Sequence, residues 1–229
     1  MTDRINMTHG GGGRAMADLI HDVFHKHLGN PVLDRGDDAG LFAVQTGRLV
    51  MSTDGHVIAP LFFPGGDIGG LCVHGTVNDL AMMGAKPLYL TAGFILEEGF
   101  PLADLDRIVR SMAQAAKAAG VQVISGDTKV VERGKGDGVF ITTTGIGVVP
   151  DGLDMSVANV AAGQSVLVSG TMGDHGVAVL SKRENLAFET TICSDSAALH
   201  GLVADMVAAV PDIAMLRDPT RGGLSATLN

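Results

Sequence analysis

The sequence predicts an α/β protein of two domains, an N-terminal domain over residues 1–153 and a second, α+β domain over 160–229. Segments with helical spacing alternate with apolar, strand-like runs along the chain. A polar, turn-rich stretch at 150–163 separates two such series. The third observation is chemical, because several apolar runs end in an aspartate set among small residues.

In the first domain, apolar residues at helical spacing predict helices over 16–28, 68–83 and 102–119. Gly29-Asn30-Pro31 stops the first helix and Gly120 caps the third. Apolar runs predict strands at 41–44, 48–52, 88–96, 121–125 and 140–149. The turn Gln45-Thr46-Gly47 makes the first two strands a hairpin.

The second domain begins with a predicted strand and then turns mainly helical. Its expected elements are a strand at 166–169, a helix from Gly173, a helix at 199–210, a strand at 213–216 and the start of one more helix. The sequence ends at Asn229 in the middle of this pattern, so we expect a domain that is cut short.

Composition limits the classes of partner. The chain has 229 residues, of which 46% are hydrophobic, and a mean hydropathy of +0.29, enough for one large core or two smaller ones. A net charge of −9 and no run of Lys or Arg argue against nucleic acid and membrane surfaces. Neither a signal-peptide core nor a membrane-spanning stretch is found, which predicts a cytoplasmic protein.

The two cysteines, Cys72 and Cys193, lie far apart in the sequence and lack metal-ligand spacing. We expect both to be reduced, structural thiols, and a disulfide between them stays open.

Aspartates at the ends of strand-like runs predict a magnesium and phosphate site. Asp54, Asp127 and Asp218 end three such runs, and the pair Asp37-Asp38 enters a fourth. Carboxylates held by rigid strands are suitable oxygen ligands for Mg²⁺. One such aspartate would be an ordinary turn residue, whereas several indicate a site.

A glycine run, His9-Gly10-Gly11-Gly12-Gly13, leads into the first helix. Its free N–H groups and the positive end of the helix dipole could hold phosphate, and a flexible linker is an equal alternative. A loose dinucleotide-binding pattern in the run is a minor interpretation. Because no Gly-Lys-Ser/Thr follows a glycine loop, a Walker-type nucleotide site is disfavoured.

Three further polar residues are candidates. Asn78 and Asp79 lie in an apolar helix, where a charge is expensive unless it is paired or binds a metal; the alternative is a helix turn that faces solvent. Lys129 suits a terminal phosphate or a leaving oxygen, or else forms a surface pair with Asp127. His21 and His25, four residues apart, are expected on a solvated helix face.

In order along the chain, these segments resemble the HypE family of hydrogenase maturation proteins. That family belongs to the superfamily of aminoimidazole ribonucleotide synthetase, selenophosphate synthetase and thiamine-phosphate kinase. The segments that carry the resemblance are His9-Gly10-x-Gly12-Gly13, Asp37-Asp38, Ser52-Thr53-Asp54-Gly55-His56-Val57, Pro60-Leu61-Phe62-Phe63-Pro64-Gly65-Gly66, Gly75-Thr76-Val77-Asn78-Asp79, Gly93-Phe94-Ile95-Leu96-Glu97-Glu98-Gly99, Ser125-Gly126-Asp127-Thr128-Lys129-Val130-Val131, Ser169-Gly170-Thr171-Met172-Gly173-Asp174-His175-Gly176 and Asp218-Pro219-Thr220-Arg221-Gly222-Gly223.

The resemblance implies an aminoimidazole ribonucleotide synthetase-like fold, in which the N-terminal sheet forms a barrel across a homodimer. It implies ATP and Mg²⁺ as cofactors, and the carbamoyltransferase HypF and a HypC–HypD complex as partners. The implied reaction is the ATP-dependent dehydration of a thiocarboxamide on a C-terminal cysteine to a thiocyanate, the source of cyanide for the iron of [NiFe]-hydrogenase.

The resemblance also assigns site residues. Lys129, Asp79 and Asp127 are the expected catalytic residues, and five aspartates are expected to hold Mg²⁺ directly or through water. These five are Asp37, Asp38, Asp54, Asp79 and Asp127. The expected nucleotide-binding residues are His9, Gly10, Gly12, Gly13, Asp54, His56, Asn78, Thr128, Asp218, Thr220 and Arg221.

The sequence departs from the family at its end, because no Pro-Arg-x-Cys tail follows the Asp218–Gly223 turn. We therefore expect the chain as written to bind Mg·ATP and dimerise without dehydrating itself. Two alternatives are a small-molecule kinase or synthetase of the same superfamily and a non-catalytic nucleotide-binding scaffold that docks maturation proteins.

Overall fold

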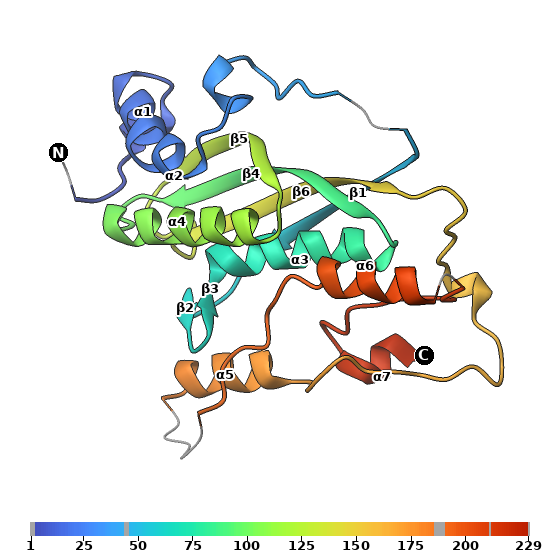
Figure 1. Ribbon diagram of the computed structural model, residues 1–229. Coiled ribbons are helices and arrows are strands. Elements are labelled where there is room, and N and C mark those ends of the chain that lie inside the picture. Colours follow the sequence, from blue (N-terminus) through green and yellow to red (C-terminus); the bar gives the residue numbers. More distant parts are fainter. Residues whose placement is uncertain (1–2, 44–45, 186–190, 211, 229) are drawn as a thin grey trace.

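A four-stranded mixed sheet forms the centre of the computed structural model, which describes residues 3–43, 46–185, 191–210 and 212–228. The strand order is β1-β6-β4-β5. These strands are β1 (Arg48–His56), β4 (Lys86–Glu97), β5 (Gln122–Val131) and β6 (Val139–Val149). β6 runs antiparallel to β1 and β4, and β5 runs parallel to β4. The helices α3 (Ile68–Met82) and α4 (Leu102–Ala118) cover one face of the sheet (Figure 1).

The two covering helices have different surfaces. In α4 the apolar residues follow helical spacing, so one stripe is buried and the other side is polar. α3 is apolar and small on most sides, because the sheet, α4 and α6 (His200–Ala209) all pack against it. Both helices, and the strands predicted at 88–96, 121–125 and 140–149, are confirmed. Within the described ranges, no helix is long and apolar enough to cross a membrane.

Asp67 starts α3, since its Oδ1 accepts hydrogen bonds from the backbone N–H of Gly69 at 2.8 Å and of Gly70 at 3.1 Å. A short hairpin of β2 (Phe62–Phe63) and β3 (Gly66–Asp67) delivers the chain to this cap. At Gly69 the helix touches the α4 backbone, where a methyl group would lie 2.1 Å from the carbonyl oxygen of Ile108. Only glycine permits so close an approach.

The N-terminal helical segment confirms the helix predicted at 16–28. It contains α1 (Arg14–Leu19), a π-helical stretch (Ile20–His25) and α2 (Lys26–Leu28). His27 Nε2 and Lys26 Nζ lie 2.9 Å and 2.7 Å from Oδ1 of Asp106 on α4. These contacts fix the segment beside α4.

The predicted hairpin of 41–44 with 48–52 is wrong. Leu41–Ala43 is irregular, and Val44 and Gln45 lie outside the described residues. β1 instead pairs along its length with β6, a strand from much later in the chain. An apolar run predicts a strand but not its partner, so the local turn was a misleading signal.

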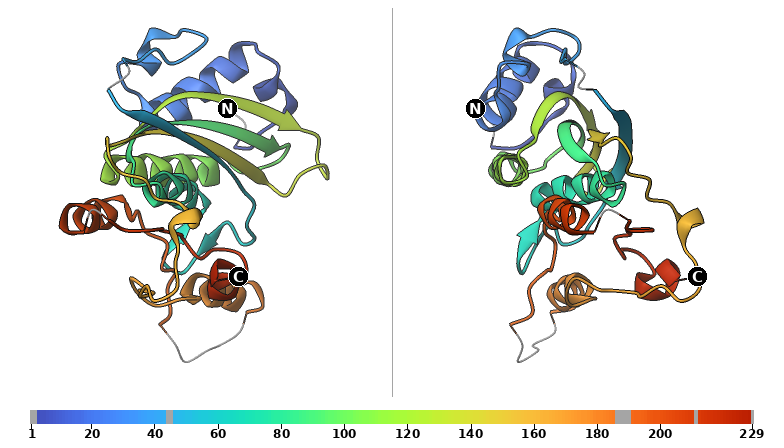
Figure 2. Two further views of the ribbon diagram at one scale, coloured as in Figure 1. Left: turned by 90° about the vertical axis from the view of Figure 1, so that its right-hand side faces the viewer. Right: turned by 45° about the vertical axis from the view of Figure 1, so that its right-hand side comes forward.

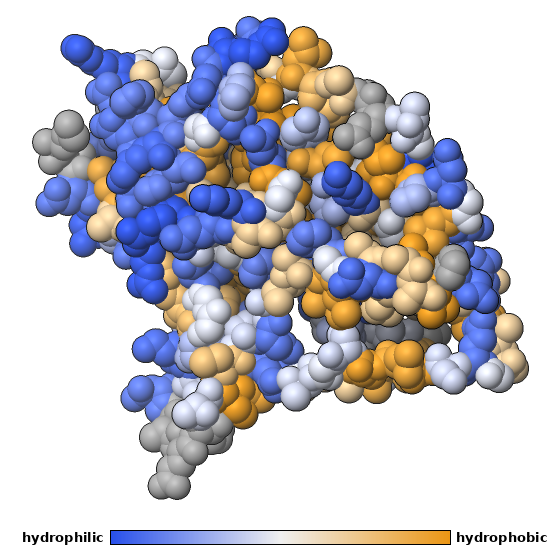
Figure 3. Space-filling model, viewed as in Figure 1, coloured by the Kyte–Doolittle hydropathy of each residue, from blue (hydrophilic) through white to orange (hydrophobic). Residues whose placement is uncertain are grey.

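The C-terminal half is mainly helix and loop. Its helices are α5 (Asp174–Arg183), α6 (His200–Ala209) and α7 (Gly223–Leu228), with α6 lying against α3 (Figures 1 and 2). The helices predicted from Gly173 and at 199–210 are confirmed, whereas 166–169 and 213–216 form no strand within the described residues. A strand needs a partner for its backbone groups, and Val166 and Leu167 are instead 67% and 85% exposed. Apolar side chains therefore reach the surface in this half of the molecule (Figure 3).

Replacing Gly69 by Ala tests the contact between α3 and α4. Its methyl group would meet a backbone oxygen, so the helices must separate, at a cost of roughly 3 kcal/mol in unfolding free energy. Gly70→Ala is the matched control, because its methyl group would lie 3.4 Å from Ser111 Oγ, an ordinary contact. Alanine at position 70 should raise the free energy of unfolding by between about 0 and 1 kcal/mol, because alanine favours a helix more than glycine does. Urea unfolding that ranks the two variants equally would contradict the close approach.

Candidate functional site

Three polar side chains of β1 face α3. Ser52, Asp54 and His56 alternate along the strand, so they share one face. Ser52 Oγ donates a 2.6 Å hydrogen bond to Oδ2 of Asp79 on α3. A methyl group on Gly75 of α3 would lie 3.0 Å from Asp54 Oδ2, so a small residue there leaves room for the carboxylate. Strand and helix thus bring Asp54 and Asp79 to one place.

His56 is the buried polar residue of this group. Its Nε2 lies 3.5 Å from Asp54 Oδ2 and 3.3 Å from Thr143 Oγ1 on β6. Thr143 also bonds Thr76 Oγ1 at 2.6 Å, which ties the imidazole to α3. Burial is the main cause of the lowered pKa of His56; Asp54 and Asp79 raise this pKa in part, and Arg221 lowers it. The ring is therefore neutral at pH 7.

Asp218 joins this group from the loop before α7. Burial and then the charges of Asp79 and Asp54 raise the pKa of Asp218 to about 6. We call Asp54, Asp79 and Asp218 the acidic group. Among the described residues, no three His, Cys, Asp or Glu side chains form a ready-made metal site. Arg217 acts on Asp218 and Arg221 acts on His56, so cationic side chains accompany the acidic group.

A second group lies on β5. Asp127 Oδ1 accepts hydrogen bonds from Lys129 Nζ at 2.8 Å and from the backbone N–H of Thr128 at 2.9 Å. The bond from Lys129 is the main reason that the pKa of Asp127 is lowered. The side chains of Asp127 and Lys129 are both 64% exposed, whereas Thr128 between them is buried. The pair therefore points away from α3 and α4.

The glycine run lies beside the same strand. Gly10 packs against Val130 of β5, where a methyl group would meet the side chain and backbone at 3.0 Å. His9 Nδ1 accepts a hydrogen bond from the backbone N–H of Asn6 at 3.0 Å, so His9 helps to cap the first turn. Gly12 and Gly13 have open space around their Cα atoms. We call Asp127, Lys129 and the run 9–13 the β5 group.

The sheet keeps the two groups apart. β1 and β5 are its opposite edges, with two strands between them, a separation of roughly 15 Å at about 5 Å per strand. Asp54 faces α3 and Asp127 faces the other side. Both aspartates also lie within their strands and not at strand ends, which corrects the sequence-based expectation. The sequence pattern does not show strand register or strand order. The prediction therefore placed Asp54 and Asp127 at one site, although they lie at opposite edges of the sheet.

Four other candidates have contacts or surroundings of their own. Asp37 pairs with Arg35 at 2.7 Å, and Asp37, Asp38 and Thr220 are exposed. The Asn78 amide contacts the backbone of residues 197 and 199. The roles assigned to these four residues stay predictions.

Sequence reasoning missed Ser52 and Thr143. Ser52 could have been found from its alternation with Asp54 and His56, whereas nothing in the sequence marks Thr143.

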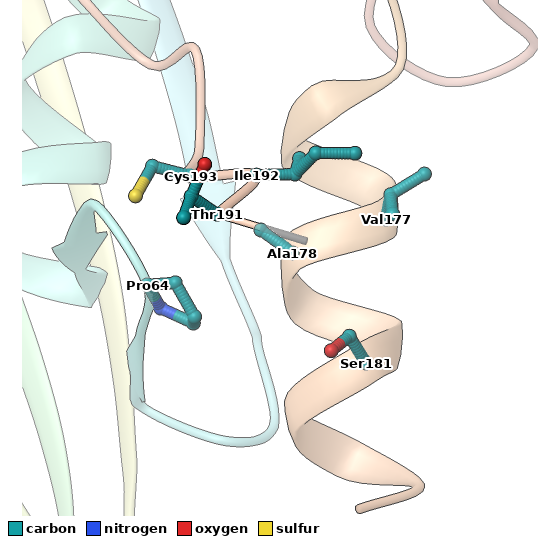
Figure 4. Close-up of a pocket in the computed structure, with 7 residues that line it drawn as sticks. All are labelled: Pro64, Val177, Ala178, Ser181, Thr191, Ile192 and Cys193. Carbon is teal, nitrogen blue, oxygen red and sulfur yellow. The ribbon is translucent and has the colours of Figure 1, made fainter. Parts of the chain in front are cut away.

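A separate hollow lies between α5 and the β2–β3 hairpin. Its volume is about 220 Å³, and Pro64, Ala178 and Cys193 are among the residues that line it (Figure 4). None of the predicted site residues lines it. Both cysteines are free, but only Cys72 is the buried structural thiol expected, because Cys193 is exposed. Its sulfur points away from α5 (Figure 4).

Asp218→Asn should stabilise the chain at neutral pH. A raised carboxyl pKa means that the folded state holds a proton that the unfolded state has lost, so stability falls as pH rises from about 4 to about 6. Because the amide of asparagine is neutral, the variant does not lose this stability. Its free energy of unfolding should exceed that of the parent chain by on the order of 1–2 kcal/mol at pH 8, and the difference should disappear near pH 3. Urea unfolding at both pH values measures it, and an equal difference at both would contradict the assignment.

Family models and relatives agree on what the chain resembles. Residues 36–149 match the model of the AIR synthase related protein N-terminal domain, and residues 161–229 match that of the C-terminal domain. Hydrogenase expression/formation protein HupE of Azotobacter chroococcum is 66% identical over 98% of this chain and 66% of its own length. Carbamoyl dehydratase HypE of Escherichia coli is 45% identical over 99% of this chain and 69% of its own.

Solved structures give the same result. Hydrogenase maturation protein HypE in complex with ATP superposes with a TM-score of 0.94 and 52% identity, covering 97% of this chain and 66% of that one. A HypE–HypF complex gives 0.78 and 53%, covering 92% and 68%. The chain thus spans about two thirds of the length of its relatives. It has the α/β fold of AIR synthase related proteins, and it belongs to the HypE family of hydrogenase maturation proteins.

Proposed function

We propose that the chain binds Mg·ATP as a homodimer and serves the ATP-dependent dehydration of a cysteine-bound thiocarboxamide to a thiocyanate. The observation that carries this proposal is the acidic group, where burial and then the charges of Asp79 and Asp54 raise the pKa of Asp218 to about 6. A relative named carbamoyl dehydratase and another solved with ATP support the reaction and the nucleotide.

The donor set suits magnesium. Mg²⁺ is usually held by one or two carboxylates together with phosphate oxygens and water, so it does not need a cage of protein ligands. Asp54 and Asp79 are the first candidates, because Ser52 orients one and Gly75 leaves space for the other. A bound cation would offset the repulsion between the carboxylates, which contributes to the raised pKa of Asp218, and it would neutralise charge on the phosphates.

The β5 group suits the phosphate chain. Lys129 is 64% exposed and carries a mobile positive charge that could move from Asp127 to a terminal phosphate. The open backbone at Gly12 and Gly13 lets N–H groups approach an anion closely. Arg221, close enough to His56 to lower its pKa, supplies a cation beside the acidic group.

The dehydration proceeds in two steps. The carbonyl oxygen of the thiocarboxamide takes the γ-phosphoryl group as the bond from γ-phosphorus to the bridging oxygen breaks, which yields ADP. The nitrogen releases one proton to solvent as the phosphorylated imidate forms. Loss of phosphate from the carbon, with release of the second N–H proton to solvent, then leaves a carbon–nitrogen triple bond. Phosphate is a good leaving group and an amide oxygen is not, so the activation makes the dehydration feasible.

A second copy of the chain would complete the site. The acidic group and the β5 group lie at opposite edges of one sheet, so a neighbouring sheet edge must bring them together. Leu49, Met51 and Ile95 leave the uncovered face of the sheet apolar, with exposures of 56%, 67% and 42%. Such a face suits burial against its own copy in a dimeric barrel.

HypF and a HypC–HypD complex are the proposed protein partners, HypF because it occurs with HypE in a solved complex.

Asp79→Asn should weaken Mg·ATP binding by about tenfold or more, because it removes a charge beside the phosphates while its oxygen can still accept from Ser52. Isothermal titration calorimetry measures the affinity. Asp151→Asn removes an exposed charge from the loop after β6 and should bind like the parent chain. Unchanged binding by Asp79→Asn would remove the acidic group from the proposed site.

Mixing two defective chains tests the shared site. Asp79→Asn and Asp127→Asn each disable a different group, so a mixed dimer has one intact site and one doubly altered site. Random pairing should restore about a quarter of the sites. Isothermal titration calorimetry on the coexpressed chains measures the number of Mg·ATP sites. If both groups act within one chain, mixing restores none.

A further inference from the structure

One side chain fastens the C-terminal half onto the helix that carries Asp79. Asn78 of α3 is only 9% exposed. Its Nδ2 donates to the carbonyl oxygen of Ala197 at 2.9 Å, and its Oδ1 accepts from the backbone N–H of Leu199 at 2.8 Å. The amide therefore holds the chain from both sides immediately before α6 begins.

A neighbouring contact extends this attachment. His74 lies one turn earlier on α3, and its Nδ1 is 3.0 Å from Ser196 Oγ. The segment 196–199 thus follows the surface of α3 and leads into α6, which packs against the same helix. Val207 of α6 and Leu216 beyond it pack against the small apolar cluster that includes Leu80 of α3.

The attachment bears on the acidic group through two adjacent residues. Successive residues on a helix point about 100° apart. Asp79 is therefore directed to β1, where Ser52 bonds it, while Asn78 is directed to the segment before α6. Asp218 follows the α6 segment along the chain and lies near Asp79. One turn of α3 thus holds both sides of the acidic group.

Only an amide makes both bonds. Asparagine offers a donor and an acceptor, whereas aspartate offers acceptors and leucine offers neither. With either replacement, the Ala197 carbonyl loses its donor, and with leucine the Leu199 N–H also loses its acceptor.

We propose that Asn78 is a positioning residue, which sets the distance of Asp218 and Arg221 from Asp79 by clasping the backbone at residues 197–199. It acts through these residues and does not itself touch the nucleotide. The proposal rests on the proposed Mg·ATP site for its functional effect, while the clasp itself can be measured without nucleotide.

Hydrogen exchange tests the clasp. Asn78→Leu and Asn78→Asp should raise exchange in the peptide covering 196–209 by about tenfold or more, because the segment loses one or both bonds. Asn30→Asp is the matched control. Asn30 is also 9% exposed and also bonds backbone with both ends of its amide, to Val123 and Val32 among others. This control should loosen the N-terminal segment and leave 196–209 protected.

Calorimetry with Mg·ATP tests the positioning. Both Asn78 variants should bind about tenfold more weakly, and Mg·ATP should protect 196–209 in the parent chain but not in the variants. Unchanged exchange at 196–209 would overturn the clasp, and raised exchange with unchanged affinity would overturn the positioning role. If the parent chain binds no Mg·ATP, the proposed function fails, and the exchange result alone decides the clasp.

Discussion

The close contact of α3 with its surroundings is the constraint on which the rest of the structure depends. Gly69 brings the helix against the α4 backbone, and Gly145 of β6 gives Thr76 and Leu80 room to approach the sheet. Because the sheet, α4 and α6 all pack against α3, its remaining polar residues have fixed directions. Asp79 meets β1 and Asn78 meets the C-terminal half, so the packing of one apolar helix determines the geometry of the polar site.

The sequence was sufficient for most of the fold. Helical spacing located α3 and α4, and apolar runs located β4 and β6 within a few residues. It failed where a strand depends on a distant partner. β1 was predicted, but its pairing with β6 was not, because side-chain pattern carries no information on which edges meet. Residues 166–169 have strand-like composition but form no strand in the described structure. There too, the side-chain pattern does not show whether a partner strand is present.

The candidate site was only partly predictable for a related reason. Residue types indicated magnesium and phosphate chemistry, and the structure does gather Asp54, Asp79 and Asp218, which lie far apart in sequence. It places Asp127 and Lys129 at the other edge of the sheet. The separation follows from strand order, which depends on all strands together and not on any single motif. The same holds for Asn78, whose partners at 197–199 could not be inferred from the helix alone.

Asp218 gives the acidic group a dependence on proton concentration. With a pKa of about 6, this carboxyl group holds its proton for part of the time near neutrality. A cation that binds beside it lowers that pKa and releases the proton to solvent. Cation and proton thus compete at Asp218, so binding of Mg²⁺ beside this carboxyl group should weaken as the pH falls through about 6.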